Sequence, residues 1–371
     1  MSPWNAAQIG DSIRSVDTPA LVLDLDAFER NLKRMADAVR GRNVRLRPHA
    51  KSHKCPEIAL RQIELGAVGI CCQKVSEAAV FVQAGVTDIL ITNQIVGTAK
   101  IRHLMELAGA ARIGVLVDHS LQIQALAVAA QASATNVDVY IEIDVGGHRC
   151  GIAPGEEAAR LAELIVASSP LRFAGLQCYH SSAQHFRSPQ ERVAAIRSAC
   201  ELALLTKKKI EARGIPVDII SGAGTGTFLL ERDSGIYNEL QSGSYVFMDR
   251  DYGDNMRGQN DIPFEHALFV LTTVMSRATG ERAIVDAGLK ASSVDSGMPS
   301  VWKRSDLKYL KASDEHGVLV TPSPSSVSLG DQLMLIPGHC DPTVNLYDSL
   351  VCVRDGKVEA LWPIAARGAL L

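Results

Sequence analysis

Short apolar runs alternate, over the first two thirds of the chain, with segments whose apolar residues recur at helical spacing. Residues 20–25 (ALVLDL) predict a strand. Residues 26–40 predict a helix, which begins with Asp26 and Glu29 at capping-box spacing. Eight further strand-like runs follow, most of them separated by a helical pattern. They span residues 44–50, 67–72, 88–93, 112–118, 137–145, 171–179, 217–222 and 240–247.

This rhythm defines the predicted fold class. Strands that alternate with helices form parallel βαβ units, and eight units over roughly 250 residues are typical of a closed (β/α)8 TIM barrel. We therefore predict a barrel over residues 26–262. Strand-like runs then follow one another with few helices between them, which predicts a β-rich C-terminal domain over residues 263–371. Residues 1–25 are expected to join this second domain.

The first barrel strand lies in the segment NVRLRPHAKSHK, residues 43–54. Its apolar side chains alternate with the cationic series Arg45, Arg47, His49 and Lys51. A solvated edge strand would account for such a face, and Pro48 fits an edge. Inside a barrel, the same face would point inward and Lys51 would lie at the C-terminal strand end, where barrel enzymes place catalytic groups. A lysine close to other cations there should have a lowered pKa and act as a nucleophile.

A second strand has the complementary pattern. Residues 137–145 alternate apolar side chains with Asp138, Tyr140, Glu142 and Asp144. Two inward faces of opposite charge could pair across the barrel, because buried charges need partners. We therefore predict an ion pair between Arg47 and Glu142.

Glycine-rich segments end the last two predicted barrel strands: ISGAGTGTF at residues 220–228 and QSGSY at residues 241–245. Tight turns would explain these glycines equally well. However, phosphate sites in such barrels commonly use the loops after strands seven and eight, where glycines let backbone N–H groups converge on the anion. A strand-end lysine together with a phosphate cradle suits pyridoxal phosphate, which needs a Schiff-base lysine and a phosphate anchor.

Composition narrows the class of protein. Of the 371 residues, 47% are hydrophobic and 21% charged, which is typical of a globular chain. The formal net charge of −3 gives no general attraction to nucleic acid or to an anionic membrane. The sequence has no signal-peptide core and no apolar run long enough to span a bilayer. Eight scattered cysteines without a CxxC pair favour a reduced, cytoplasmic location.

Six motifs resemble one known group of enzymes. They are TPALVLDLDAFERN, RPHAKSHK, DVGGHRCGI, GLQCYHSS, SGAGTGT and PGHCDPTVNLYD. Together they are similar to the fold-type III pyridoxal phosphate enzymes related to alanine racemase. Within that family the chain most resembles the D-threonine aldolase group, with D-serine dehydratase and D-3-hydroxyaspartate dehydratase or aldolase as neighbours. The resemblance runs from about residue 17 to the C-terminus and implies a homodimer.

The resemblance implies specific roles. Lys51 would form the Schiff base with the cofactor, and His185 would lie near the substrate side chain. Arg149 and Tyr179 would contact the cofactor ring or its phenolic oxygen, and Gln73 would face the cofactor. The phosphate cradle would consist of Gly222, Gly224, Thr225, Gly243, Ser244 and Tyr245.

Simpler explanations exist for several of these residues. Arg149 could be a salt-bridge partner at the barrel rim, and Tyr179 could simply pack at the end of its strand. His185 lies in the polar segment SSAQHFRSP, where a solvated histidine is the common case.

The resemblance also implies that His339 and Asp341 bind a divalent metal ion. On its own, an HxD pair is usually part of a surface loop, and two ligands fall short of the four in a structural zinc site. A histidine and a carboxylate, completed by water and substrate, suit Mn²⁺ or Mg²⁺, with Zn²⁺ as a third choice. In D-serine dehydratases the second position is cysteine, so Asp341 favours the aldolase.

The expected reaction is cleavage of D-3-hydroxy-amino acids, small-molecule substrates, to glycine and an aldehyde. A dehydratase that releases an oxo acid and ammonia remains the main alternative. Two further classes stay open: a noncatalytic pyridoxal phosphate-binding protein, and a barrel metal hydrolase without that cofactor. The extra β-rich domain argues against the first, and Lys51 with the glycine-rich segments argues against the second.

Overall fold

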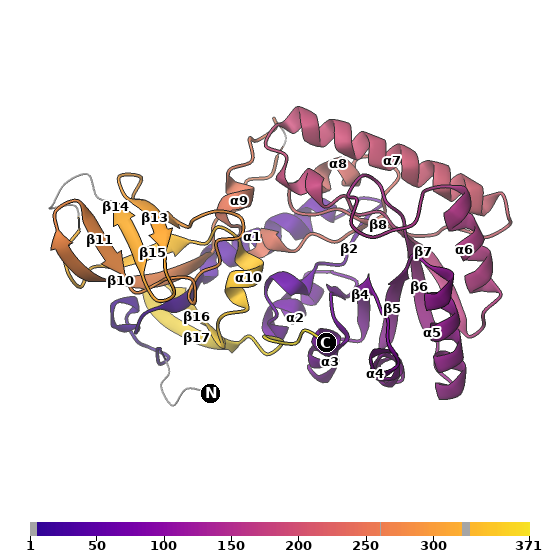
Figure 1. The fold of residues 1–371 in the computed structure, drawn as a ribbon, viewed down its shortest axis with the longest axis horizontal. Helices are drawn as coiled ribbons and strands as arrows, with labels where there is room; N and C mark the ends of the chain where they lie inside the picture. The colour runs from indigo at the N-terminus through magenta and orange to yellow at the C-terminus, as the bar shows by residue number, and fades with distance from the viewer. Residues whose placement is uncertain (1–5, 260, 321–326) are drawn as a thin grey trace.

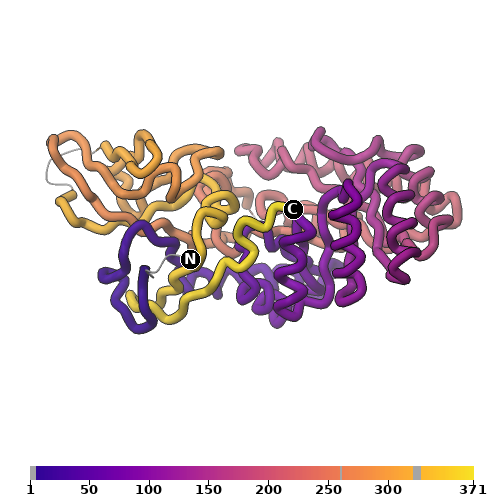
Figure 2. The backbone as a smooth tube through the Cα atoms, turned by 60° about the horizontal axis from the view of Figure 1, so that its bottom comes forward, coloured from indigo at the N-terminus to yellow at the C-terminus, as the bar shows by residue number. Residues whose placement is uncertain are grey.

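The chain forms two β-sheet units joined side by side into an elongated molecule, as the views in Figures 1 and 2 show. The structure, a computed structural model, describes residues 6–259, 261–320 and 327–371. One unit is a barrel of eight parallel strands, and the other is a nine-stranded mixed sheet. The predicted fold class is confirmed.

The barrel strands follow in the order β2-β9-β8-β7-β6-β5-β4-β3. A bridge between His49 and Cys71 links the β2 edge to β3 and closes the ring. The bounds are β2 Arg45–Leu46, β3 Ile70–Cys72, β4 Asp88–Gln94, β5 Arg112–Val117, β6 Val137–Glu142, β7 Leu171–Gln177, β8 Ile220–Gly222 and β9 Glu239–Leu240.

Helices cover the outside of the barrel strands, and the long helix α7 crosses the top of the barrel in Figure 1. Residues such as Val139 and Ile141 pack outward against them in one large apolar cluster. A smaller cluster built on Leu116 and Tyr140 fills the interior. The helix bounds are α2 Pro56–Glu64, α3 Val75–Gln83, α4 Thr98–Ala108, α5 Ser120–Ser133, α6 Glu156–Val166, α7 Pro189–Glu211 and α8 Phe228–Arg232.

Two predicted barrel strands are much shorter than expected. The eighth comprises only residues 239–240, before most of the predicted run, and Ser244–Val246 instead forms the 3-10 helix η4. The first ends at Leu46, and Lys51 lies in the 3-10 helix η2, Ala50–Ser52. At the C-terminal end of the barrel, residues predicted as strand therefore form 3-10 helices in both segments.

The predicted ion pair between Arg47 and Glu142 is wrong. Arg47 donates to Glu239 at 3.0 Å and to Asp88 at 2.7 Å, and Glu142 accepts a hydrogen bond from Gln94. Because β2 neighbours β9, an acidic residue on the adjacent strand reaches Arg47 first.

The second sheet contains the first strand of the chain. Strand β1 lies antiparallel to β10 and parallel to β16, and helix α1 then leads to the barrel. Runs predicted from the sequence form β10, β11, β14, β15, β16 and β17; residues 321–322 of the run GVLVTP lie outside the described residues. The bounds are β1 Ala20–Asp24, α1 Leu25–Val39, β10 Leu268–Thr279, β11 Arg282–Val285, β12 Ser300–Val301, β13 Lys308–Ala312, β14 Gly317–Val320, β15 Gln332–Ile336, β16 Ser349–Arg354 and β17 Lys357–Pro363.

Two short helices lie between the sheets. They are α9, Arg250–Gly253, and α10, Cys340–Val344, and both appear near the centre of Figure 1. Within the part of the chain that the structure describes, no helix is long and apolar enough to cross a membrane.

Candidate active site

Lys51 lies where the barrel meets the second unit. Its Nζ atom forms an ion pair with the Asp341 carboxylate of α10, and its side chain is 39% exposed. The backbone N–H of Lys51 donates to His49 Nδ1 at 3.3 Å, which fixes the turn. The structure thus brings together two predicted site residues that are 290 positions apart in sequence.

The expected lowering of the Lys51 pKa is wrong. Burial alone would lower it, but the Asp341 carboxylate, with a smaller contribution from Tyr179, raises the pKa of Lys51 above its ordinary value. Lys51 and His339 in turn lower the pKa of Asp341 to about 2, against the opposing effect of burial. In this arrangement Lys51 is an ammonium ion and Asp341 a carboxylate.

His49 and Gln73 form a polar cluster beside Lys51. His49 Nε2 lies 2.9 Å from Thr92 Oγ1 and 3.1 Å from Gln73 Nε2. Burial, and then the Lys51 charge, lower the pKa of His49 well below its ordinary value. Since its Nδ1 accepts from Lys51 N, the neutral ring carries its proton on Nε2. Gln73 therefore contacts His49, the neighbour of Lys51, and its expected contact with a cofactor stays a prediction.

The metal pair His339 and Asp341 spans the start of α10. Asp295 lies 2.8 Å from His339 Nδ1, while Nε2 lies 3.9 Å from Asp341 Oδ1. A carboxylate on one ring nitrogen fixes the ring and leaves the other nitrogen for a ligand, as is usual around metal-binding histidines. Among the described residues no group of three or more His, Cys, Asp or Glu side chains is placed to hold an ion. Water and substrate would have to complete the coordination of a metal here.

The glycine-rich segments meet at the same rim. A Cβ atom on Gly222 would lie 2.6 Å from the Cys178 carbonyl oxygen, and one on Gly243 would lie 2.7 Å from that of His49. A Cβ on Gly224 would collide with the Gln184 side chain. Close packing thus requires these glycines whether or not an anion binds.

Unpartnered hydroxyl groups nearby fit a phosphate. Thr225 Oγ1 and Ser242 Oγ are buried and have no hydrogen-bond partner among the described residues. Such groups cost free energy unless a ligand or water satisfies them. Ser244 begins η4, but the buried Tyr245 side chain accepts a hydrogen bond from Gln62 at 3.0 Å. Any part that Tyr245 takes in the cradle is therefore through its backbone.

Arg149 and Tyr179 lie together at the barrel mouth. The guanidinium carbon of Arg149 is 5.7 Å from the centroid of the Tyr179 ring. Burial raises the pKa of Tyr179, and the charges of Lys51 and Arg149 oppose that shift. Both residues are thus close enough to Lys51 to influence a cofactor held by it.

His185 ends the 3-10 helix η3, Ser182–His185, and is partnered rather than simply solvated. Its Nδ1 atom forms a short contact with Asp251 of α9, and its ring lies 5.9 Å, centroid to centroid, from Tyr252. Tyr252 in turn is close enough to Tyr179 and Asp341 for their charges to raise its pKa, after burial. His185 therefore belongs to the same site.

Four functional candidates escaped sequence reasoning: Asp249, Asp251, Tyr252 and Asp295. The first three lie in the segment MDRDYGD, whose concentration of acidic residues is the only signal. The Asp249 carboxylate accepts from Tyr252 N at 3.0 Å and from Cys340 N at 2.9 Å. It thereby joins α9 to the start of α10. This one buried carboxylate thus fixes Asp251, the residue that contacts His185, relative to His339 and Asp341.

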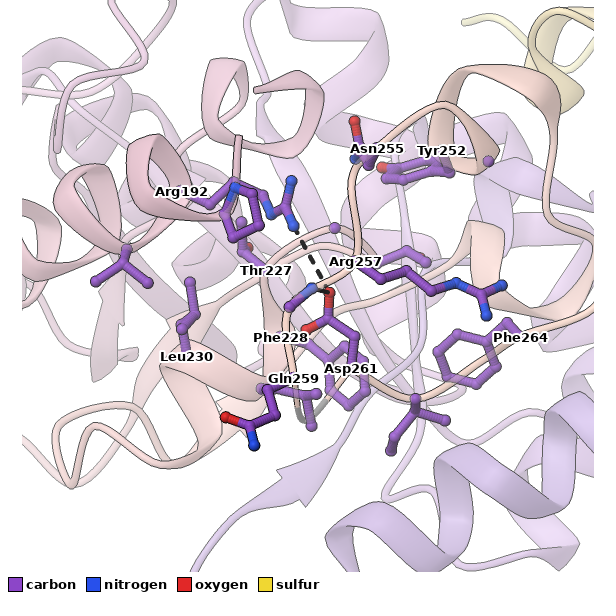
Figure 3. Close-up of a pocket in the computed structure, with 18 of the residues that line it drawn as sticks. Arg192, Thr227, Phe228, Leu230, Tyr252, Asn255, Arg257, Gln259, Asp261 and Phe264 are labelled. Atoms are coloured by element: carbon purple, nitrogen blue, oxygen red, sulfur yellow. Dashed lines mark hydrogen bonds and ion pairs between the residues drawn. The ribbon is translucent and has the colours of Figure 1, made fainter. Parts of the chain in front are cut away.

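A cavity of about 510 Å³ borders this site (Figure 3). It is lined by Thr225 and Phe228 of the glycine-rich segment and by Tyr252, and Arg192 and Asp261 face each other across it at 3.6 Å. Neither Lys51 nor the metal pair lines it. The cavity therefore lies behind the glycine-rich segment and is separate from the lysine.

Comparison with known proteins defines the class. The family model described as "Alanine racemase, N-terminal domain" matches residues 23–251, and that described as "Putative serine dehydratase domain" matches residues 267–353. The chain belongs to the alanine racemase-like, fold-type III family of pyridoxal phosphate enzymes.

Individual proteins are similar to this chain over nearly its whole length. The chain is 48% identical to D-threonine aldolase from Arthrobacter sp., over 98% of this chain and 96% of the relative. It is 45% identical to 3-hydroxy-D-aspartate aldolase from Paracoccus denitrificans (strain Pd 1222), over 95% and 92%. The crystal structure of D-threonine aldolase from Filomicrobium marinum has a TM-score of 0.98 and 49% identity, over 99% of this chain and all of that one. The predicted family is confirmed.

Proposed function

We propose that this chain is a D-threonine aldolase that depends on pyridoxal phosphate and a divalent metal ion and cleaves D-3-hydroxy-amino acids to glycine and an aldehyde. The observation that supports the proposal is the contact between Lys51, the proposed Schiff-base lysine, and Asp341 of the proposed metal pair. Near-complete similarity to two aldolases supports the same reaction type, a carbon–carbon lyase.

The residues present fit the cofactor, because the barrel offers a lysine and, in its glycine-rich segments, two buried hydroxyls that have no hydrogen-bond partner among the described residues. When bound, pyridoxal phosphate supplies the electron sink for the pair of electrons released from the Cα–Cβ bond. Lys51 would hold it covalently. Gln73, Arg149 and Tyr179 would line it, and the cradle of Gly222, Gly224, Thr225, Gly243, Ser244 and Tyr245 would hold its phosphate.

His339 and Asp341 would hold the metal ion, with Mn²⁺ favoured over Mg²⁺ or Zn²⁺ for an imidazole–carboxylate pair. Such an ion lowers the pKa of an oxygen bound to it. His185 would remove the proton of the substrate β-hydroxyl. Only one Cα configuration would place that hydroxyl at the ion while the phosphate stays in its cradle, which accounts for a D-specific enzyme.

Chelation and product analysis test the proposal. Removal of the metal should abolish cleavage of D-threonine but leave the cofactor spectrum largely intact, because His339 and Asp341 hold the substrate side of the site. Mn²⁺ should restore glycine and acetaldehyde, Asp341→Ala should mimic chelation, and L-threonine should be inert.

Two results would contradict the proposal. Full activity after chelation would mean that the pair is not a catalytic metal site. Stoichiometric ammonia and oxo acid would identify a dehydratase, the activity class named in the match to the C-terminal residues.

A further inference from the structure

We propose that Asp251 is a positioning residue that holds His185 in the one tautomer able to act as a base in the proposed cleavage. The inference rests on the proposed function for the identity of the reaction. It rests on the geometry of α9 for the hydrogen bond itself.

The Asp251 carboxylate has a separate partner for each oxygen. Oδ2 contacts His185 Nδ1, and Oδ1 pairs with Arg187 Nη2. Arg187 Nη1 also donates to the Asp251 carbonyl oxygen and, at 2.6 Å, to Asn255 Oδ1. Arg187 thus holds Oδ1 of the carboxylate, and Oδ2 accepts from the His185 imidazole.

Burial and charge keep that carboxylate ionised. The Asp251 side chain is 7% exposed, whereas that of His185 is 49% exposed. Burial would raise the pKa of Asp251, but hydrogen bonds from His185 and Arg187 lower it below its ordinary value. An ionised carboxylate accepts only, so His185 carries a proton on Nδ1, and in the neutral ring Nε2 is then bare.

The backbone of α9 ties this pair to the metal motif. Arg250 N donates to Pro337 O at 3.0 Å, and Asp251 N donates to Gly338 O at 3.2 Å, immediately before His339. The imidazole therefore has a fixed tautomer and a fixed place beside the segment that would hold the substrate hydroxyl.

The role follows from proton balance. The β-hydroxyl proton would pass to His185 Nε2 as the Cα–Cβ bond breaks and the Cβ–O bond becomes a carbonyl. The bound cofactor would supply the electron sink for the released pair, and one proton would return to Cα to give glycine. Asp251 stays ionised and stabilises the imidazolium that forms. This is the division of labour between the aspartate and histidine of a catalytic triad.

Asp251→Asn is the direct test. The amide oxygen can still accept from Arg187, but the amide nitrogen would donate to His185 Nδ1 and force the proton onto Nε2. We expect kcat for D-threonine cleavage to fall by about 10²–10⁴-fold, the usual contribution of a positioned base, with KM and cofactor absorbance little changed. Asp254→Asn is the matched control, because Asp254 is the C-cap of the same helix and, among the described residues, its ion pair is with Arg250 at 3.4 Å. A kcat for Asp251→Asn within threefold of the control would overturn the proposal.

Histidine ¹⁵N NMR reads the tautomer in the wild-type protein itself and uses a variant only to assign the signals. The spectrum of the holoenzyme at pH 8.5, with the His185 signals identified from their loss in His185→Gln, should show Nδ1 protonated and Nε2 bare. Any other state of His185 overturns the inference. If the wild type releases no aldehyde, the proposed function fails, and the tautomer of His185 still tests the hydrogen bond separately.

Discussion

Lys51 cannot serve Asp341 and the cofactor at once. Without cofactor its ammonium group neutralises the Asp341 carboxylate, which burial would otherwise make costly. Covalent attachment to the cofactor, the role proposed for Lys51, would remove that partner and leave Asp341 free to bind a cation. We therefore expect cofactor loading and metal affinity to reinforce each other.

Replacing Lys51 by alanine tests its assignment. Lys51→Ala should abolish the visible absorbance of covalently bound pyridoxal phosphate and the cleavage of D-threonine, because no other lysine is bonded to the metal motif among the described residues. Absorption spectra of purified wild type and variant, with the exposed Lys290→Ala as a control, give the measurement. A normal cofactor spectrum in Lys51→Ala would refute the assignment.

Lys51 could be identified as a candidate from the sequence, because the alternating pattern of its segment is a local property of the chain. The direction of its pKa shift could not be predicted, because its partner Asp341 lies in the distant helix α10. Asp251 and Asp295 were missed for the same reason, because each becomes a functional candidate only through its contact with a histidine in another segment.

At the scale of elements, the short helix α8 buries an acid. Glu231 is 1% exposed; its Oε1 atom accepts from Thr227 at 2.8 Å, and its Oε2 atom has no partner among the described residues. Burial raises the pKa of Glu231 from 4.5 to about 7. The folded chain therefore binds one more proton than the unfolded chain between these two pH values.

This proton makes stability depend on pH. Since the folded state binds the extra proton, stability should fall as pH rises from about 4.5 to 7, by about 3 kcal/mol for this group. Glu231→Gln stays neutral, so its urea midpoint should exceed that of wild type at pH 8 and approach it at pH 5. As a control, Glu163→Gln removes an exposed carboxylate, and its urea midpoint should differ from that of wild type by the same amount at pH 5 and at pH 8. A Glu231→Gln variant that gains nothing at pH 8 would show that the folded protein tolerates the charge.

Element prediction succeeded where strands are long. Strands β4 to β7 follow the predicted runs closely, because six or seven residues of alternating or continuous apolar character leave few other structures. Strands β2 and β9 pair over two residues each, and the 3-10 helices η2 and η4 take up part of the predicted strand runs that follow them. The division of domains at residue 262 remains a prediction.

At the scale of the molecule, a series of ion pairs runs along the N-terminal end of the barrel strands. Glu239 joins Arg45 and Arg47, Asp88 links Arg47 to Arg112, and Asp138 links Arg112 to Arg172. Most of these pairs join neighbouring strands, and the pair between Arg47 and Asp88 spans β3. Only the pair between Arg47 and Glu239 is buried on both sides, so loss of either partner there would leave a buried charge uncompensated.

We also expect two copies of the chain to associate, as the family resemblance implies. Light scattering at assay concentration should give twice the 39.8 kDa chain mass, because family members usually act as homodimers with active sites near the interface. A fully active species of single-chain mass would contradict this expectation. A cytoplasmic location remains a proposal that fractionation would test.

Strand β1 has a consequence for how the protein is made. It is synthesised first, yet both of its neighbours, β10 and β16, lie in the last third of the chain. On the ribosome the barrel segments emerge while β1 still lacks both partners, and an unpaired apolar strand edge is a template for wrong pairing. Strand β1 therefore keeps an unpaired edge until β16, which ends at residue 354, has left the ribosomal exit tunnel.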